Sequence, residues 1–123
     1  MPYTATKEQQ QVFMKDHQHL KQALNLGKEA LWLTREECVK AGPSLEETLV
    51  LIRQALTAHG KKEYEMPAKI GVHPWSDVFY HAMPAYVPNN LACGIKWIAC
   101  YPRNPKEFGL DQTTGLLVLN DIE

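Results

Sequence analysis

The stretch FYHAMPAYVPNNLACGIKWIACYPRNP, residues 79–105, decides the fold of this 123-residue chain. It contains two runs rich in β-branched and aromatic residues, and the Pro-Asn-Asn at 88–90 between them is typical of a turn. Pro84, Pro102 and Pro105 are expected to punctuate the strands. The second run, residues 94–101, reads as a buried strand, yet it carries Lys96 at its centre. An ammonium group there needs a reason, because lysine is almost never fully buried without a partner.

Two interpretations of Lys96 follow from its position in the strand. Strand alternation places it on one face with Gly94 and Ile98, while Trp97 points to the other face. It is either an edge-strand lysine that discourages aggregation, or an ammonium that lines a pocket and holds a carboxylate or polarises a reacting group. Spacing and composition alone favour the edge-strand interpretation.

Outward from this stretch, the hydrophobic period is that of strands in the whole second half of the chain. Short strands are expected at residues 69–72, 78–82, 94–101 and 115–119. The first half has a helical period instead. Capping-box signals that begin at Thr6, Thr34 and Ser44 predict three helices.

These helices are expected at residues 6–26, from 35 to Gly42-Pro43, and from 45 to a stop at Gly60. A short strand is expected at 30–33. The sequence therefore predicts an α+β fold, with N-terminal helices followed by a mostly antiparallel sheet.

The composition is that of an ordinary globular domain, with 45% hydrophobic and 22% charged residues. Thirteen Lys and Arg against 14 Asp and Glu give a net charge of −1, so no basic excess favours nucleic acid or anionic membranes. No apolar run approaches the roughly 18 residues that a membrane span requires. The start of the chain does not have the pattern of a signal peptide.

Cysteine and histidine usage argues against disulfides and metals. The three cysteines are an odd number without CxxC spacing, which favours reduced thiols and a cytoplasmic location. The five histidines lack metal-ligand spacing, so no metal site is predicted. The GxGxxG, P-loop, HExxH and GxSxG motifs are all absent from these 123 residues.

Several other polar residues could carry chemistry, and each has a plainer interpretation. Lys69 opens a strand and could simply be a solvated strand end. His81 alternates with Phe79 and Met83, and a hydrogen-bonded, half-buried histidine is the plainer explanation. Residues 111–114 could cap a turn before the last strand or offer hydrogen bonds to a ligand.

Five segments in register carry a resemblance to a known family. They are EMPAK (65–69), AMPAY (82–86), GIKW (94–97), YPRNP (101–105) and GLLVLND (115–121), and LWLTRE (31–36) precedes them. Together they resemble the N-terminal part of the ornithine cyclodeaminase/μ-crystallin family over about residues 30–123. The resemblance implies a domain at 30–123 that binds substrate and dimerises, preceded by a helical extension at 1–29.

In that family a hydride passes between NAD or NADP and the α-carbon of an amino acid or its imine. The resemblance therefore implies a cyclodeaminase (a lyase), an amino-acid dehydrogenase or a ketimine reductase (oxidoreductases). The implied partners are a small amino-acid or imine substrate and a second copy of the chain in a homodimer. The family continues into a dinucleotide-binding Rossmann domain after about residue 123. A truncated chain that binds no dinucleotide alone is therefore expected.

The resemblance also implies roles for individual residues. Lys96 matches a lysine that contacts the substrate carboxylate or the reacting group, and it is the predicted catalytic residue. Lys69 matches a carboxylate-binding position that is often arginine. His81 stands where ornithine-cleaving members carry glutamate, which argues against ornithine as the substrate. Met83 completes the predicted substrate-binding set.

The implied cofactor contacts lie before the last strand. Gln112 and Thr113 match positions near the nicotinamide, and Asp111 lies beside them. With the resemblance, the pocket interpretation of Lys96 becomes the favoured one. The alternative is a non-catalytic oligomerisation or binding module derived from the same family.

Overall fold

The computed structural model describes residues 7–8, 11, 23–25, 27–88, 92–120 and 122. The chain divides into two compact units, Thr6–Glu63 and a second that contains Tyr64–Glu123, and each is described by itself. Among the described residues, no helix is long and apolar enough to cross a membrane. The predicted boundary between residues 29 and 30 stays a prediction.

Two helices of the first unit begin at the capping boxes that the sequence predicts. In α2 (Arg35–Ala41) the Thr34 side chain accepts from the Glu37 backbone N–H, and the Glu37 carboxylate accepts from the Thr34 N–H. Ser44 and Glu47 repeat this exchange at the start of α3 (Leu45–Lys61). Both exchanges satisfy N–H groups that have no partner inside the helix.

Three expectations for the first unit need correction or fall outside the description. Gly60 does not end α3, because the helix runs to Lys61 and Lys62 takes the left-handed C-cap conformation with φ 59°. Residues 30–33 do not form a strand, since the described residues give them no backbone partner. Of the predicted helix at 6–26, residues 7, 8, 11 and 23 are helical, and most of the remainder lies outside the described residues.

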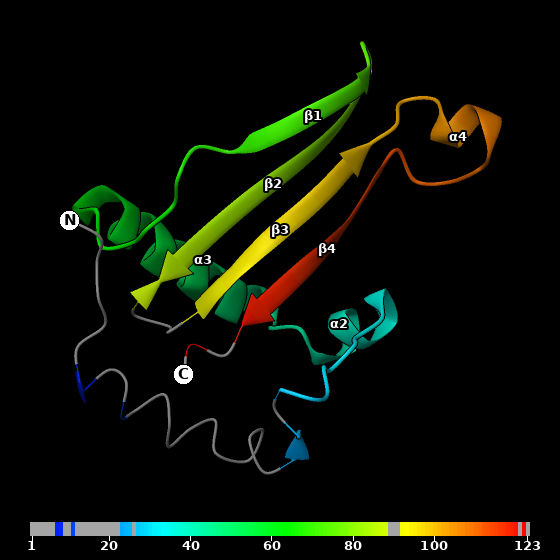
Figure 1. The fold of residues 1–123 in the computed structure, drawn as a ribbon. Helices are drawn as coiled ribbons and strands as arrows, with labels where there is room; N and C mark the ends of the chain where they lie inside the picture. Colours follow the sequence, from blue (N-terminus) through cyan, green and yellow to red (C-terminus); the bar gives the residue numbers. More distant parts are fainter. Residues whose placement is uncertain are drawn as a thin grey trace. The chain divides into compact units, whose positions relative to one another are not determined.

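The second unit is a four-stranded antiparallel sheet in the order β1-β2-β3-β4. Figure 1 shows the strands side by side, from β1 in green to β4 in red, with the short helix α4 between β3 and β4. Their bounds are β1 Ile70–Trp75, β2 Val78–Val87, β3 Ala92–Cys100, α4 Asn104–Glu107 and β4 Thr113–Asn120. Each strand pairs with its sequence neighbour, so the sheet is a meander. With the helices of the first unit, it confirms the α+β class.

β2 is longer than its predicted counterpart, because Pro84 lies inside the strand instead of ending it. The register with β1 ends at Ala82, and the next contact on that side is the bridge between Glu65 and Tyr86. On the β1 side of β2, Pro84 therefore lies between these two pairings. Its missing N–H removes no hydrogen bond from either of them.

The register defines two faces of the sheet. The face with Lys96 is called the Lys96 face, and the opposite one is called the Trp97 face. The Lys96 face carries the alternate residues Gly71, Phe79, His81, Met83, Gly94, Lys96, Ile98, Cys100, Thr113, Gly115, Leu117 and Leu119. The Trp97 face carries Tyr80 stacked on Trp97, with ring centroids 6.0 Å apart.

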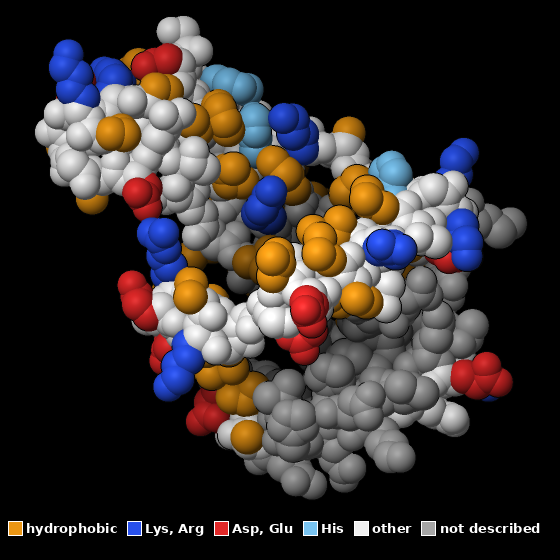
Figure 2. Space-filling model, turned by 180° about the vertical axis from the view of Figure 1, so that it is seen from behind, with side chains coloured by type: hydrophobic (Ala, Val, Ile, Leu, Met, Phe, Trp, Pro, Cys, Tyr) orange, Lys and Arg blue, Asp and Glu red, His pale blue; other side chains and the backbone are white. Residues whose placement is uncertain are grey.

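Among the described residues, few apolar side chains are buried, and those that are include Val78, Ala82 and Cys100 in the sheet, and Ala58 in α3. Figure 2 shows hydrophobic side chains gathered on the described surface. The exposed apolar residues of the sheet include Ile70 and Val72 of β1 and Leu116 to Leu119 of β4, all more than two-fifths exposed. The apolar stripe that the sequence predicts on α3, at Leu45, Leu49, Ile52 and Leu56, is exposed as well.

Candidate functional site

Lys96 lies in an inner strand, and the residue is exposed. β3 is paired with β2 on one side and β4 on the other, so Lys96 is not an edge-strand lysine. Its direct neighbours across the two ladders are Met83 and Leu117. The ammonium group therefore stands on the middle of a sheet face between two apolar side chains.

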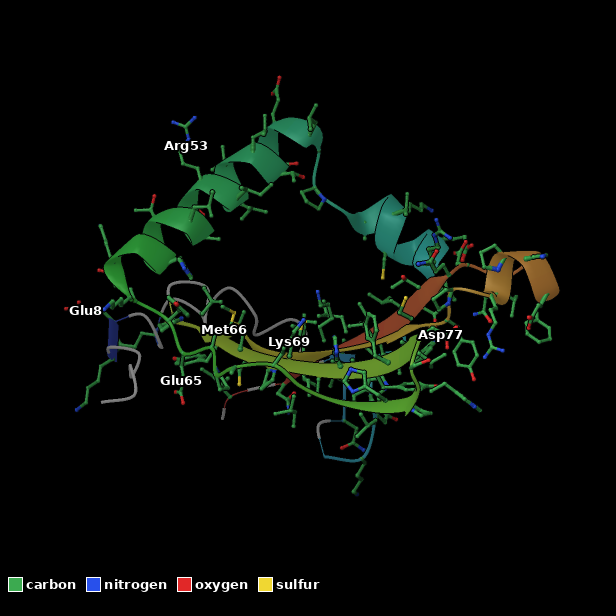
Figure 3. The ribbon with its side chains drawn as sticks, turned by 90° about the horizontal axis from the view of Figure 1, so that it is seen from above. Glu8, Arg53, Glu65, Met66, Lys69 and Asp77 are labelled. Atoms are coloured by element: carbon green, nitrogen blue, oxygen red, sulfur yellow. The ribbon has the colours of Figure 1, made fainter. Side chains whose placement is uncertain are left out.

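Lys69 comes directly before β1, whose pairing with β2 begins at Ile70. Ile70 is paired with Ala82 of the Trp97 face, so by alternation Lys69 belongs to the Lys96 face. In Figure 3, Lys69 lies where the chain enters β1, and Asp77 lies at the far end of that strand. The row of cross-strand neighbours around Lys96 is Met83, Lys96 and Leu117.

A cluster of rings lies next to that row on the Lys96 face. The ring of His81 stacks on Phe79, with centroids 4.1 Å apart and planes 19° apart. His73 meets the edge of His81 at 5.9 Å and contacts Phe79 at 6.4 Å. Gly71 makes room for this packing, because a Cβ at residue 71 would collide with the imidazole of His81.

This environment disfavours a positive charge on His81. Its pKa is held below the ordinary histidine value, first because packing removes water from the ring. The charges of Lys69 and His73 then oppose protonation and lower the pKa further. At neutral pH the imidazole is neutral, and it can donate one hydrogen bond and accept another.

The candidate cofactor residues lie at the end of the sheet where β4 begins. Thr113 is on the Lys96 face, in one row with Cys100 and Phe79. The side-chain amide of Gln112 lies 3.7 Å from the Cys100 sulfur, and the Gln112 carbonyl accepts from Tyr101 N–H. The Asp111 carbonyl accepts from the Asn104 amide, which ties this segment to α4.

The structure thus brings His81, Met83 and Lys96 onto one sheet face in two adjacent rows, and Lys69, directly before β1, belongs to the same face by alternation. Thr113 is on that face one row further along, whereas Asp111 and Gln112 precede β4. Sequence reasoning did not single out His73. Two signals in the sequence could have indicated it. His73 is two residues from Gly71, and the short turn at 76–77 brings β1 alongside β2.

The described residues do not supply a complete dinucleotide site. All four strands are antiparallel, and a pyrophosphate site of the Rossmann type requires a parallel strand–helix–strand unit with a glycine-rich turn. Among the described residues, no group of three or more His, Cys, Asp or Glu could hold a metal ion.

Comparison with known proteins places this geometry in a family. The model of the ornithine cyclodeaminase/mu-crystallin family matches residues 31–123. The nodulation efficiency protein NfeD of Rhizobium meliloti is 42% identical over 90 residues, which are 73% of this chain and 28% of that protein. The N-((2S)-2-amino-2-carboxyethyl)-L-glutamate dehydrogenase of Staphylococcus aureus is 29% identical over 105 residues, 80% of this chain and 31% of that enzyme.

A solved structure shares the fold. An archaeal alanine dehydrogenase dimer with bound NAD superposes with a TM-score of 0.64 at 29% identity, over 73% of this chain and 27% of that one. This chain therefore spans less than a third of the length of these relatives. The family match covers the α4 segment and all four strands, and it extends back through α2 and α3. The chain belongs to the ornithine cyclodeaminase/mu-crystallin family.

Proposed function

We propose that this chain forms the substrate-binding and dimerisation part of an NAD(P)-dependent enzyme that acts on the α-carbon of an amino acid or its imine. Family membership supports the general class, and the two dehydrogenase relatives favour an oxidoreductase over a lyase. Three cysteines without disulfide bonds are consistent with a cytoplasmic protein.

One observation carries the proposal: Lys96 is the central charge on the face of an inner strand. An edge lysine protects a sheet from pairing with other chains, but β3 has no free edge, so protection does not explain the residue. An ammonium group with Met83 and Leu117 as cross-strand neighbours is suited to bind a carboxylate as that surface becomes covered.

Lys69 and Lys96 lie on one face near Met83, and this placement supports separate roles for the three side chains. The two ammonium groups bind the substrate α-carboxylate from either side of Met83, whose thioether contacts the carbon chain. Lysine in place of arginine at 69 offers a point charge and not a bidentate fork. Lys96 also polarises the α-nitrogen or the imine as the reaction proceeds.

The nicotinamide supplies the hydride chemistry when it is bound. We propose that Gln112 and Thr113 approach it from the end of β4, with Asp111 beside them. Thr113 shares the Lys96 face with the substrate row, which favours this direction of approach. Residues that bind the phosphates of the dinucleotide come from outside the described sheet.

The test is to express the coding region as far as it extends beyond codon 123 and to assay the product. NADH or NADPH formation is measured with a panel of L-amino acids, and the reverse reaction with 2-oxo acids and ammonia. Turnover of at least one amino acid or imine supports the proposal. A longer product that contains a dinucleotide-binding segment but reduces or oxidises none of the panel contradicts it.

The second candidate is a non-catalytic oligomerisation or binding module. The exposed apolar residues on both faces of β4 favour it, because such surface is suited to association. A coding region that stops at codon 123, with a stable oligomer as its product, would support this function over the first.

A further inference from the structure

The Lys96 face has more basic groups than one α-carboxylate needs. Lys96 is paired with Met83, Lys69 comes directly before β1 on the same face, and His81 in the adjacent row is met at its edge by His73. The described acidic residues of this unit are Glu65, Asp77, Glu107 and Asp111. None of them belongs to a strand row of this face.

Each of these acids is placed elsewhere. Glu65 pairs with Tyr86, which belongs to the Trp97 face, and Asp77 is in the turn with its carboxylate 3.5 Å from Arg103. Glu107 belongs to α4, and Asp111 precedes β4. The described part of the Lys96 face therefore has lysines and imidazoles but no carboxylate among its charged and imidazole groups.

We propose that this face takes an amino acid with a second carboxylate, which His73 and His81 bind while Lys69 and Lys96 bind the α-carboxylate. This inference rests on the proposed function and adds the substrate class and the role of His73. The ligand is a dicarboxylic amino acid or the corresponding imine.

The spacing of the rows suits such a ligand. Met83 and His81 are two residues apart on one strand face, which separates their Cα atoms by about 7 Å. An α-carboxylate between the lysines and a side-chain carboxylate at the imidazoles can be bridged by the carbon chain of glutamate. Phe79 fixes the plane of His81 by stacking, and His73 meets its edge, so the two rings are preorganised.

The charges also exclude a competing class. The side-chain ammonium of ornithine would lie among Lys69, Lys96 and two imidazoles, without a described carboxylate on this face to pair with it. A side-chain carboxylate at that position instead offsets the positive charges around His81 and accepts a hydrogen bond from its ring N–H. The expected order of affinity is glutamate, then alanine, then ornithine.

The experiment is a titration of the ¹⁵N-labelled 123-residue chain with L-glutamate, L-alanine or L-ornithine, followed by backbone chemical shifts. We expect glutamate to bind more tightly than alanine and to shift β1 and β2 resonances near His73 and His81. His73→Phe keeps the ring contacts and removes the N–H. It should reduce the preference for glutamate over alanine about tenfold, the loss expected for one hydrogen bond to a charged group.

Controls separate the outcomes. His73→Gln keeps a donor and should retain most of the preference, and His59→Asn in α3 should leave it unchanged. Amide spectra of each variant verify that the sheet is intact. Equal affinity for glutamate and alanine, unaffected by His73→Phe, overturns this inference and leaves the proposed function standing. If all three amino acids leave the resonances of the Lys96 face unshifted, the proposed substrate site and this inference both fail.

Discussion

At the scale of single residues, Lys96 gives the most direct prediction. Lys96→Met keeps the apolar stem and removes the charge. In the longer product assayed for turnover, we expect kcat/KM to fall at least about a hundredfold, roughly 3 kcal/mol of lost transition-state stabilisation. The free energy of unfolding should stay unchanged or rise slightly, because an exposed ammonium group contributes little to folding.

The matched control is Lys106→Met in α4, an exposed lysine away from the sheet face. It should leave both turnover and stability at the parent values. Parent-like turnover by Lys96→Met, measured on correctly folded protein, would show that Lys96 has no role in the pocket.

The second residue-scale prediction concerns the titration of His81. Its pKa is lowered in the folded state by loss of water around the ring, then by the charges of Lys69 and His73. The folded protein therefore binds a proton more weakly than the unfolded chain. The free energy of unfolding therefore falls as the pH drops from the pKa of an ordinary histidine towards the lower pKa of His81 in the folded protein.

Proton NMR of the imidazole measures this directly. The His81 resonance should titrate below the range of an unperturbed histidine, and Lys69→Met should raise its pKa by removing one nearby cation. Urea unfolding should give a smaller loss of stability between pH 7.5 and pH 5.5 for His81→Phe than for the parent protein. A His81 pKa that is the same in Lys69→Met and the parent would contradict the electrostatic link.

Strand period predicted which candidate residues share a face, whereas their proposed roles came from the family resemblance. Alternation alone put His81 with Met83, and Lys96 with Ile98, on common faces, and the register confirms both placements. His73 could not be assigned, because its ring contacts depend on an irregular register between Val72 and Trp75. A bulge changes which side chains follow one another on a face, and Pro74 in this stretch is compatible with a bulge but does not specify which face His73 joins.

At the scale of secondary-structure elements, the end of α3 has its helix-breaking residues in unusual places. Gly60 lies inside the helix, where glycine is unfavourable, and Lys62 takes a left-handed conformation that favours glycine. Gly60→Ala should raise the free energy of unfolding by about 0.5–1 kcal/mol, since no atom obstructs the new Cβ. Lys62→Gly should add roughly 1 kcal/mol.

Chemical denaturation of the two single variants and the double variant checks this prediction. Gly42→Ala is a useful contrast, because Gly42 is extended and its Cβ would approach the Cys38 carbonyl at 3.0 Å. That variant should not gain stability. Destabilisation by Lys62→Gly would mean that the lysine side chain contributes more than its backbone strain costs.

Helix starts could be predicted well and strand limits less well, for a physical reason. A capping box such as Ser44 with Glu47 is a local exchange of hydrogen bonds, so its sequence signal is sufficient. A strand depends on a partner that may be distant in sequence. Residues 30–33 have strand-forming side chains but no described partner, and β2 passes through Pro84 because β1 has already diverged from it there.

At the scale of the whole molecule, many large apolar side chains of the described residues are exposed. In the part of the chain that the structure describes, few apolar side chains are buried, whereas Ile70, Val72 and Trp75 are each more than half exposed on β1. Ile70 and Val72 belong to the Trp97 face by their pairing with Ala82 and Tyr80. Exposed apolar side chains gathered on one sheet face favour association.

The last prediction follows from this surface: the purified chain forms a dimer or a higher oligomer. The Trp97 face is the expected contact, because it lacks the lysines that make burial of the opposite face costly. Sedimentation velocity over a range of concentrations should show an associating species. Val72→Lys places a charge on the Trp97 face and should weaken self-association, while Val39→Lys on the exposed surface of α2 should not. A parent chain that stays monomeric at the highest concentration would leave the Trp97 face without a role in assembly.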